Sequence, residues 1–208
     1  MRPLLGALMW AVQTRMDIAY AVHRCARYAS DESRREELWR RLLRIVSYLK
    51  SCIDDGVIFA AGNREDWPRI CAFADSDFAG DKDTRRSTTG IVVCYNGAPI
   101  YWKSVLQSPS AVDTARLPAL SSGQAEFNAV AQVVQDCLGF RNLLSFFDEL
   151  EGEREEWATT VPVLTRKELG NTLGFDVVPG AGLIVLSDST VATDEADATI
   201  RIECAFRT

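Results

Sequence analysis

The sequence predicts an α/β protein in which a helical segment precedes a sheet and its covering helix. Apolar residues recur at helical spacing through residues 3–52, and this periodicity indicates amphipathic helices. Between residues 70 and 104, three short apolar runs are separated by turn signals, which is typical of neighbouring strands. A further helical stripe begins near residue 121. We therefore expect a helical unit over residues 1–61 and a sheet-containing domain over residues 68–208.

The helical segment is expected to contain two helices within residues 3–29 and a longer one over residues 32–52. Ser30 and Asp31 are good N-cap residues for the longer helix. Its predicted apolar face consists of Leu38, Leu42, Ile45, Val46 and Leu49. Its polar face is expected to carry five arginines, namely Arg34, Arg35, Arg40, Arg41 and Arg44. These arginines suit contact with nucleic-acid phosphates, and they equally suit an ordinary solvated helix face.

The run from Ile70 to Ala74 leads directly into Asp75, and a second carboxylate follows at Asp77. Because both alternating faces of this run are apolar, we predict a central strand that is covered on both sides. Asp75 would then lie in or near a core, where a lone charge is costly unless it is paired or bound to a metal ion. A shorter strand is predicted over residues 57–60, and the polar stretch 62–68 is the expected domain boundary.

Two more strands are predicted after a charged loop over residues 80–90, at residues 91–95 and 99–104. Asn96-Gly97 lies between them and is a strong signal for a tight hairpin turn. Together with the strand that carries Asp75, they are expected to form an antiparallel meander.

Ser121 and Gln124 form a capping box that opens the next helix. On this helix, Glu126 is rotated by only about 40° from the apolar Val130, taking 100° per residue. Glu126 is therefore expected beside the buried face, where a carboxylate favours a cation as its neighbour.

Later segments supply further acids. Residues 183–186 are a short apolar strand that ends next to Asp188, and a final strand over residues 200–206 would carry Glu203. Taken singly, each acid of the chain suits an ordinary cap or loop residue. Taken together, Asp75, Glu126 and Asp188 have the order expected of a carboxylate cluster that binds hard divalent cations.

Composition narrows the classes of function. No apolar run approaches the 18 residues that indicate a membrane-spanning helix, and the N-terminus lacks the features of a signal peptide. With His23 as the sole histidine, neither a histidine-based zinc site nor a serine–histidine–aspartate triad can form. The 6 cysteines show no CxxC spacing, which predicts buried free thiols in a reducing compartment.

Charge is distributed unevenly along the chain, whose net charge is -6. Residues 1–50 carry ten basic and five acidic side chains, whereas residues 51–208 carry thirteen and twenty-four. This asymmetry suits an anionic polymer that one part grips and that metal-loaded carboxylates in the other part cut. It also suits two ordinary surfaces of opposite sign.

Several stretches resemble copia-type retrotransposon Pol polyproteins, and the resemblance covers about residues 3–138. The segments LGALMW, TRMDIAYAV and IVSYLK, which begin at residues 5, 14 and 45, are similar to the end of the reverse transcriptase. The segments ADSDFAGD, RSTTG, IYWKS and LSSGQAEF, which begin at residues 74, 86, 100 and 120, are similar to the ribonuclease H domain of that family. The last of these is the strongest match.

The resemblance implies a ribonuclease H-like mixed sheet flanked by helices, with its first three strands antiparallel, after a remnant of the polymerase thumb or connection region. It implies an endonuclease that hydrolyses the RNA strand of RNA–DNA hybrids with two Mg²⁺ ions, for which Mn²⁺ can substitute. The catalytic, metal-binding acids that it implies are Asp75, Glu126, Asp188 and Glu203. Asp77 is expected to be a structural acid.

The resemblance also favours a nucleic-acid-facing role for the arginines of the helix over residues 32–52. The implied partners are the RNA–DNA hybrid and the remainder of the Pol polyprotein, and no membrane association is implied. The implied location is a cytoplasmic retrotransposon particle or the nucleus. The polymerase's own Tyr-x-Asp-Asp block is absent, so no polymerase activity is expected. Residues 151–182 depart from the family pattern, and Arg201 stands where the family has a histidine. The alternative is therefore a catalytically decayed or domesticated fragment that only binds nucleic acid or protein.

Overall fold

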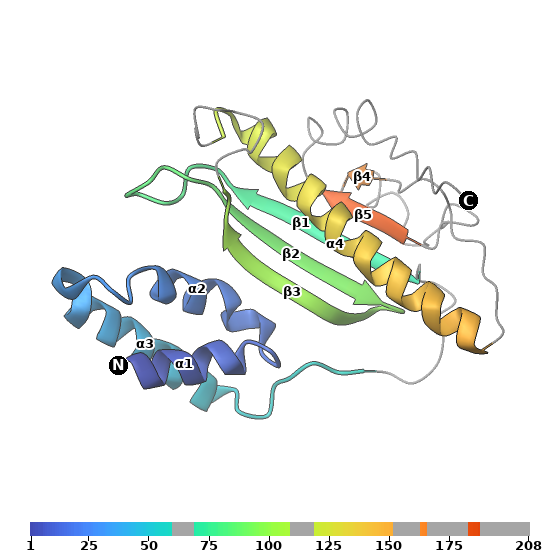
Figure 1. Cartoon of the computed structure of the whole chain (residues 1–208). Helices are drawn as coiled ribbons and strands as arrows, with labels where there is room; N and C mark the ends of the chain where they lie inside the picture. The colour runs from blue at the N-terminus through green and yellow to red at the C-terminus, as the bar shows by residue number, and fades with distance from the viewer. Residues whose placement is uncertain (60–68, 109–118, 152–162, 166–182, 188–208) are drawn as a thin grey trace.

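A computed structural model describes residues 1–59, 69–108, 119–151, 163–165 and 183–187. The elements run in the order α1 (Arg2–Ala11), α2 (Ala19–Arg27), α3 (Arg35–Ser51), β1 (Ile70–Asp77), β2 (Thr88–Tyr95), β3 (Ala98–Leu106), α4 (Ser122–Glu151), β4 (Val163–Thr165) and β5 (Leu183–Ser187). Short 3-10 turns at Met16–Ile18 and Glu32–Arg34 precede α2 and α3. The helical unit lies beside the sheet, as Figure 1 shows. This arrangement confirms the α/β class.

The three helices of the helical unit bury one shared apolar core. Its buried members are Leu5, Leu8, Ile18, Val22, Cys25, Leu38, Leu42 and Ile45. The predicted face of α3 is confirmed at Leu38, Leu42 and Ile45, but Val46 lies at the surface. Val46 follows Ile45 by 100° around the helix, which turns it away from the core. Asp31 accepts a hydrogen bond from the Ser33 amide at 3.0 Å, as expected of a capping residue.

The strands form one mixed sheet in the order β3-β2-β1-β5-β4. The first three are antiparallel, which confirms the predicted meander, and β5 runs parallel to both β1 and β4. Asn96 and Gly97 have positive φ angles of 47° and 81°, as a tight turn between β2 and β3 requires. The predicted strand over residues 57–60 is wrong for residues 57–59, where Ile58 is 82% exposed and none of the described strands pairs with the chain. Residue 60, the expected boundary at 62–68 and the expected last strand over 200–206 lie outside the described residues.

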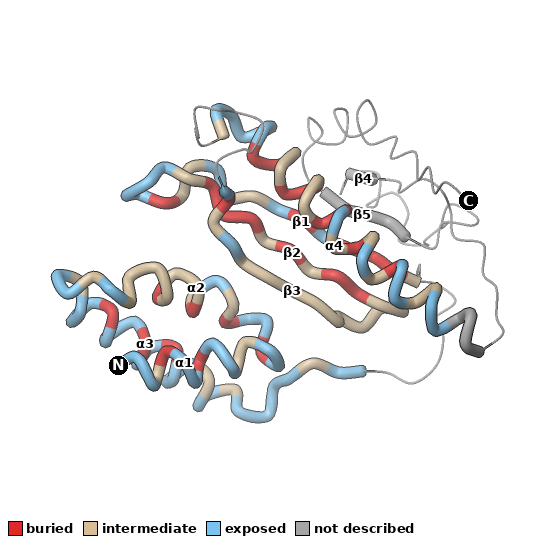
Figure 2. Tube along the Cα trace, in the orientation of Figure 1, coloured by how far each residue is buried: buried red, intermediate tan, exposed pale blue. Residues whose placement is uncertain are grey.

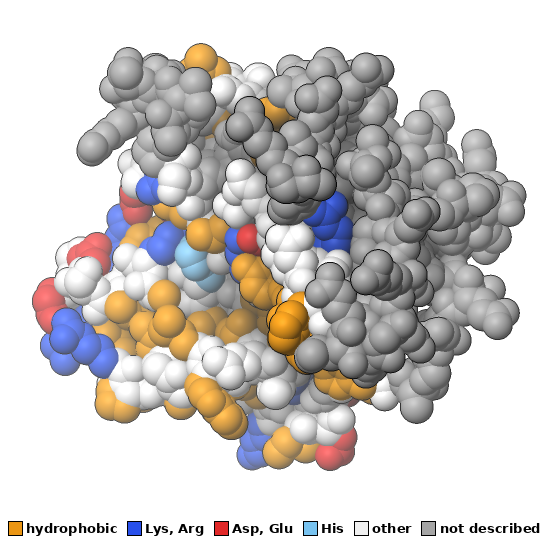
Figure 3. Space-filling view, turned by 45° about the vertical axis from the view of Figure 1, so that its right-hand side comes forward, with side chains coloured by type: hydrophobic (Ala, Val, Ile, Leu, Met, Phe, Trp, Pro, Cys, Tyr) orange, Lys and Arg blue, Asp and Glu red, His pale blue; other side chains and the backbone are white. Residues whose placement is uncertain are grey.

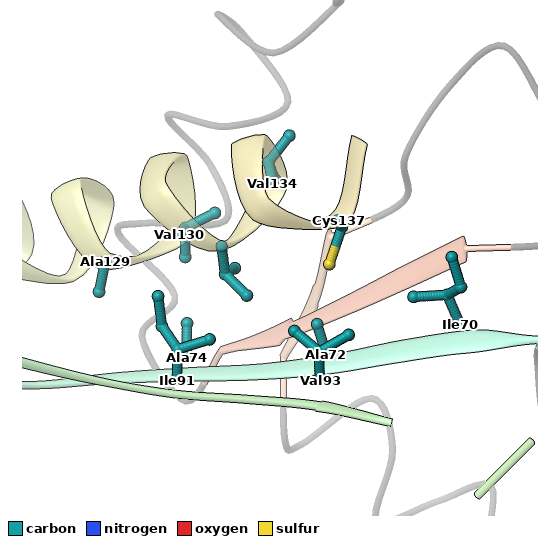
Figure 4. Packing of buried hydrophobic residues seen from close by; sticks show 10 residues of the cluster. Ile70, Ala72, Ala74, Ile91, Val93, Ala129, Val130, Val134 and Cys137 are labelled. Atoms are coloured by element: carbon teal, nitrogen blue, oxygen red, sulfur yellow. The ribbon is translucent and has the colours of Figure 1, made fainter. Parts of the chain in front are cut away.

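One long helix, α4, covers one face of the sheet. Small and β-branched side chains of α4 pack onto alternate residues of β1 and β2, as Figure 4 shows. This core consists of Ile70, Ala72, Ala74, Ile91, Val93, Ala129, Val130, Val133, Val134 and Cys137. The predicted Ser121 cap is confirmed, since the Gln124 amide donates to Ser121 Oγ at 3.1 Å, but the Gln124 side chain accepts from the Leu120 amide at 2.7 Å instead of from that of Ser121. The helix continues without a break through Gly139.

The second face of the sheet is covered only in part. Trp102 on β3 donates its indole N–H to the Val12 carbonyl at 2.7 Å, and α2 packs beside the same strand. Over the carboxyl half of β1 this face is open, because Phe73 and Asp75 are both exposed, whereas Cys71 on the same face is buried (Figure 2). The prediction of a central strand is confirmed, and the prediction of cover on both sides holds at Cys71 but is wrong at Phe73 and Asp75. The helical unit reaches this face at β3, and the carboxyl half of β1 is exposed there.

The expected thiol state is confirmed for the cysteines that the structure describes. All five are free, and Cys25, Cys71, Cys94 and Cys137 are buried. Burial raises the pKa of Cys71 and of Cys137 to about 12, so both are uncharged at neutral pH. Within the described part of the chain, no helix is long and apolar enough to cross a membrane.

Candidate active site

Asp75 lies near the carboxyl end of β1, on the open face of the sheet. Strand alternation puts it on the same face as Phe73 and opposite Ala74, which packs toward α4. Its neighbour across the β1–β2 pairing is Gly90. A Cβ built at Gly90 would meet nothing within 4 Å, so the surface beside the carboxylate is unobstructed. The expectation that Asp75 is buried is wrong, because the face that carries it is uncovered.

Glu126 stands in the first turns of α4 and is 9% exposed. It precedes the core residue Val130 by one turn, and its burial confirms the position expected from helix periodicity. Its helix packs on the face of β1 opposite to that of Asp75. A shared site therefore requires the two carboxylates to meet at the end of the sheet rather than across it.

Gln107 holds the start of α4 against the meander. Its side-chain amide donates to Thr89 Oγ1 at 3.0 Å and to the Ala125 carbonyl at 2.8 Å. Its own oxygen accepts from Asn128 Nδ2 at 3.4 Å. Gln107 is thus bonded to the residue before Gly90 and to the residue before Glu126. Gln107 was not among the residues expected from the sequence, although a glutamine directly after a strand is a signal for such a crosslink.

The carboxyl ends of β1 and β5 lie side by side. The two strands are parallel, and their register pairs Ala74 with Ser187. The residues that immediately precede Asp75 and Asp188 are therefore neighbours. Asp188 and Glu203 themselves lie outside the described residues. In the part of the chain that the structure describes, no group of three acidic, histidine or cysteine side chains is arranged to hold a metal ion.

The loop between β1 and β2 is organised around Asp81, which sequence analysis did not single out. Asp81 Oδ1 accepts hydrogen bonds from the amides of Asp83 and Thr84 and from the Thr84 hydroxyl, at 2.9–3.1 Å. Its Oδ2 binds Arg27 Nη1 of α2 at 2.6 Å. Burial alone would raise the pKa of Asp81, but the hydrogen bonds from Thr84 and the charge of Arg27 lower it. The loop is thereby fixed to the helical unit.

Asp77 packs against the backbone of the same loop. A Cβ added at Gly80 would lie 1.9 Å from Asp77 Oδ2, so a larger residue there requires the Asp77 side chain to move. Ser87, in the RSTTG segment, accepts a hydrogen bond from the Ala79 amide through its hydroxyl at 3.1 Å. Through these contacts, Asp77 and Ser87 help to set the conformation of the loop.

Three of the arginines expected to contact nucleic acid are engaged in ion pairs. Arg34 forms two hydrogen bonds with Asp83, at 2.7 and 2.8 Å, and stacks over the Tyr28 ring. Arg35 pairs with Glu32 and Arg41 pairs with Glu37. Arg40 and Arg44 are exposed and form no ion pair with any residue that the structure describes. The contacts of Arg34 thus indicate a mainly structural role, in which it joins the helical unit to the β1–β2 loop.

The fold and the position of Asp75 define an α/β protein with a mixed sheet that carries an acid at the carboxyl end of its central strand. No protein-family profile matches the chain, and no solved structure matches it. The chain does match several curated proteins. The chain belongs to the family of copia-type, retrovirus-related Pol polyproteins from transposons.

Two such relatives are polyproteins of plant transposons. The chain is 32% identical over 141 residues to that of transposon TNT 1-94 from Nicotiana tabacum, and 31% identical over 144 residues to that of transposon RE2 from Arabidopsis thaliana. These alignments cover 67% and 69% of the chain but only 10% and 9% of the polyproteins. A third relative, secreted RxLR effector protein 161 from Plasmopara viticola, is 33% identical over 135 residues, which are 64% of the chain and 86% of the effector.

Proposed function

We propose that this chain is the ribonuclease H part of a copia-type Pol polyprotein, with a ribonuclease H-like fold, and that it hydrolyses the RNA strand of RNA–DNA hybrids. The observation that carries the proposal is the parallel pairing of β1 with β5 in the register Ala74–Ser187. In open sheets, functional groups gather beyond the carboxyl ends of such strands. In the sequence an aspartate follows each residue of this pair, Asp75 after Ala74 and Asp188 after Ser187. The similarity to transposon Pol polyproteins supports the same assignment.

Carboxylate oxygens are the donors that Mg²⁺ prefers, so the chemistry of the proposed acids fits that ion. Asp75 and Glu126 would hold it together with Asp188 and Glu203. A pair of bound ions would supply an activated water and stabilise the leaving oxygen. The protein contributes position: Asp75 stands on an open surface that a polymer can reach, and Gln107 fixes the helix start that carries Glu126.

The test is cleavage of an end-labelled RNA–DNA hybrid by the full chain in the presence of Mg²⁺. Asp75→Asn and Glu126→Gln should each reduce cleavage at least about a hundredfold, since even residues that merely support metal ligands cost 10–100-fold. Asp54→Asn is the matched control, because Asp54 is an exposed acid outside the sheet. Cleavage that survives Asp75→Asn, or its absence from the wild-type chain at high concentration, would refute the proposal. Loss of Mg²⁺ binding in Asp75→Asn, measured by calorimetry, gives a readout independent of activity.

A second candidate is a module that binds nucleic acid or protein without cutting. It is favoured by the relative that the chain covers at 86% of its length, which is named as a secreted effector rather than as a polyprotein. This candidate predicts that the chain binds the hybrid in a salt-sensitive manner and leaves it intact.

A further inference from the structure

We propose that a sugar–phosphate backbone passes over Gly90, between Asp75 on β1 and helix α2, and that Arg24 contacts one of its phosphates. The inference rests on the proposed function and assigns the path of the substrate. It places the nucleic-acid contact on α2 instead of α3.

The floor of this path is the open face of the sheet. Three residues form a row across it, since Asp75 pairs with Gly90 and Gly90 pairs with Ser104. Gly90 lies within a central strand, where glycine weakens the strand and often marks the close approach of another backbone or ligand. Its φ angle is not in the left-handed region, and an added Cβ would meet no atom within 4 Å. Neither backbone conformation nor packing within the described part of the chain therefore requires glycine there.

The wall of the path is the face of α2 that is turned away from the helical core. Tyr20, His23, Arg24 and Arg27 recur at helical spacing, opposite the face that buries Val22 and Cys25 in the helical core. The C-terminal end of α2 is fixed to the β1–β2 loop by the pair between Arg27 and Asp81. This end of the helix thus lies near the carboxyl end of β1. Figure 3 shows the histidine among basic side chains, with apolar side chains beside them.

The arginines of α2 and those of α3 differ in their ion pairs and in their distance from the sheet. Arg27 is committed to Asp81, but Arg24 forms no ion pair with any described residue. Tyr20 is 48% exposed and offers a ring on which a base or sugar can pack. By contrast, α3 packs against α2, and α2 is the helix that lies beside β3 (Figure 1). A backbone that reaches Asp75 would meet Arg24 before it met the arginines of α3.

The substitution Gly90→Val tests the floor of the path. Valine favours strands and has room for its Cβ, so the urea midpoint of the chain should stay unchanged or rise. Binding of an RNA–DNA hybrid to the Asp75→Asn chain, measured by fluorescence anisotropy, should weaken at least about tenfold, or by 1.4 kcal/mol, when Gly90→Val is added. Gly139→Ala is the matched control, because a Cβ at Gly139 also meets nothing within 4 Å. It should leave binding unchanged.

The wall is tested with Arg24→Ala against Arg40→Ala, since both arginines lack ion pairs with described residues. Arg24→Ala should weaken binding and lower the salt dependence of log K by about one, as expected for one lost phosphate contact. Arg40→Ala should change neither.

The outcomes separate the two proposals. Hybrid binding that Gly90→Val leaves intact overturns the path even if the chain cleaves, and so does a complete lack of binding by the Asp75→Asn chain. If Gly90→Val weakens binding but the wild-type chain never cleaves the hybrid, the path is supported and the proposed hydrolase activity is refuted.

Discussion

Replacing Arg27 with methionine tests how strongly the β1–β2 loop holds the helical unit against the sheet. Methionine keeps much of the apolar volume but removes the guanidinium that contacts Asp81 Oδ2 at 2.6 Å. Asp81 is 3% exposed, so its charge would remain buried without a cation. Breaking a buried pair in this way costs about 3–5 kcal/mol. Two features favour the lower end, about 3 kcal/mol: Asp81 keeps the hydrogen bonds on Oδ1, and Arg27 Nε and Nη2 are themselves buried without a hydrogen-bond partner in the described structure.

Urea unfolding followed by far-UV circular dichroism measures the loss, and Arg34→Met is the internal control. The pair between Arg34 and Asp83 joins the same two parts of the chain, but its side chains are 36% and 43% exposed. Such a pair contributes at most about 1 kcal/mol. A double-mutant cycle with Asp81→Asn isolates the coupling of Arg27 to Asp81. If Arg27→Met costs no more than Arg34→Met, or if the cycle shows no coupling, the buried pair does not anchor the loop.

Three further predictions concern individual side chains. Gly80→Ala should destabilise the chain by about 1–3 kcal/mol in the same urea assay, because its Cβ would overlap Asp77, and adding Asp77→Ala should recover most of the loss. The hydrogen bonds from Arg15 lower the pKa of Asp17 to about 2. The stabilisation from ionised Asp17 is therefore complete above about pH 4 and is lost as pH falls through 2, so the gap in unfolding free energy between wild type and Asp17→Asn should close over that range. In a Cys204→Ser background, iodoacetamide should label the partly exposed Cys52 first, with Cys71 and Cys137 protected until the chain unfolds, and early labelling of Cys71 would contradict its burial.

Local patterns in the sequence were sufficient for much of the fold. The turn at Asn96-Gly97 and the helix cap at Ser121 each depend on residues a few positions apart, and both are confirmed. The burial of Glu126 followed from its angle to Val130 on one helix. In each case the determining contacts are short-range, so the pattern carries the information.

Long-range packing accounts for the expectations that were wrong. The apolar residues of β1 predict burial on both faces, but what covers each face depends on where the helical unit docks, and it docks at β3. Residues 57–59 have strand-like composition, yet none of the strands in the described part of the chain pairs with them. The partner of Arg34, Asp83, is 49 positions away, so the charge pattern of the helix alone could not reveal the pair. The metal-binding role of all four acids stays a prediction.

The insertion of β5 beside β1 has a consequence for synthesis of the chain. Ile70 pairs with Leu183, more than a hundred residues later. At a translation rate of about 5–20 residues per second, roughly 5–20 seconds pass between the appearance of the two strands. During that interval β1 is the edge of a three-stranded sheet, and its unpaired amides and carbonyls can template pairing with another chain. A nascent chain stalled before β5 should therefore be more prone to aggregate than the finished one.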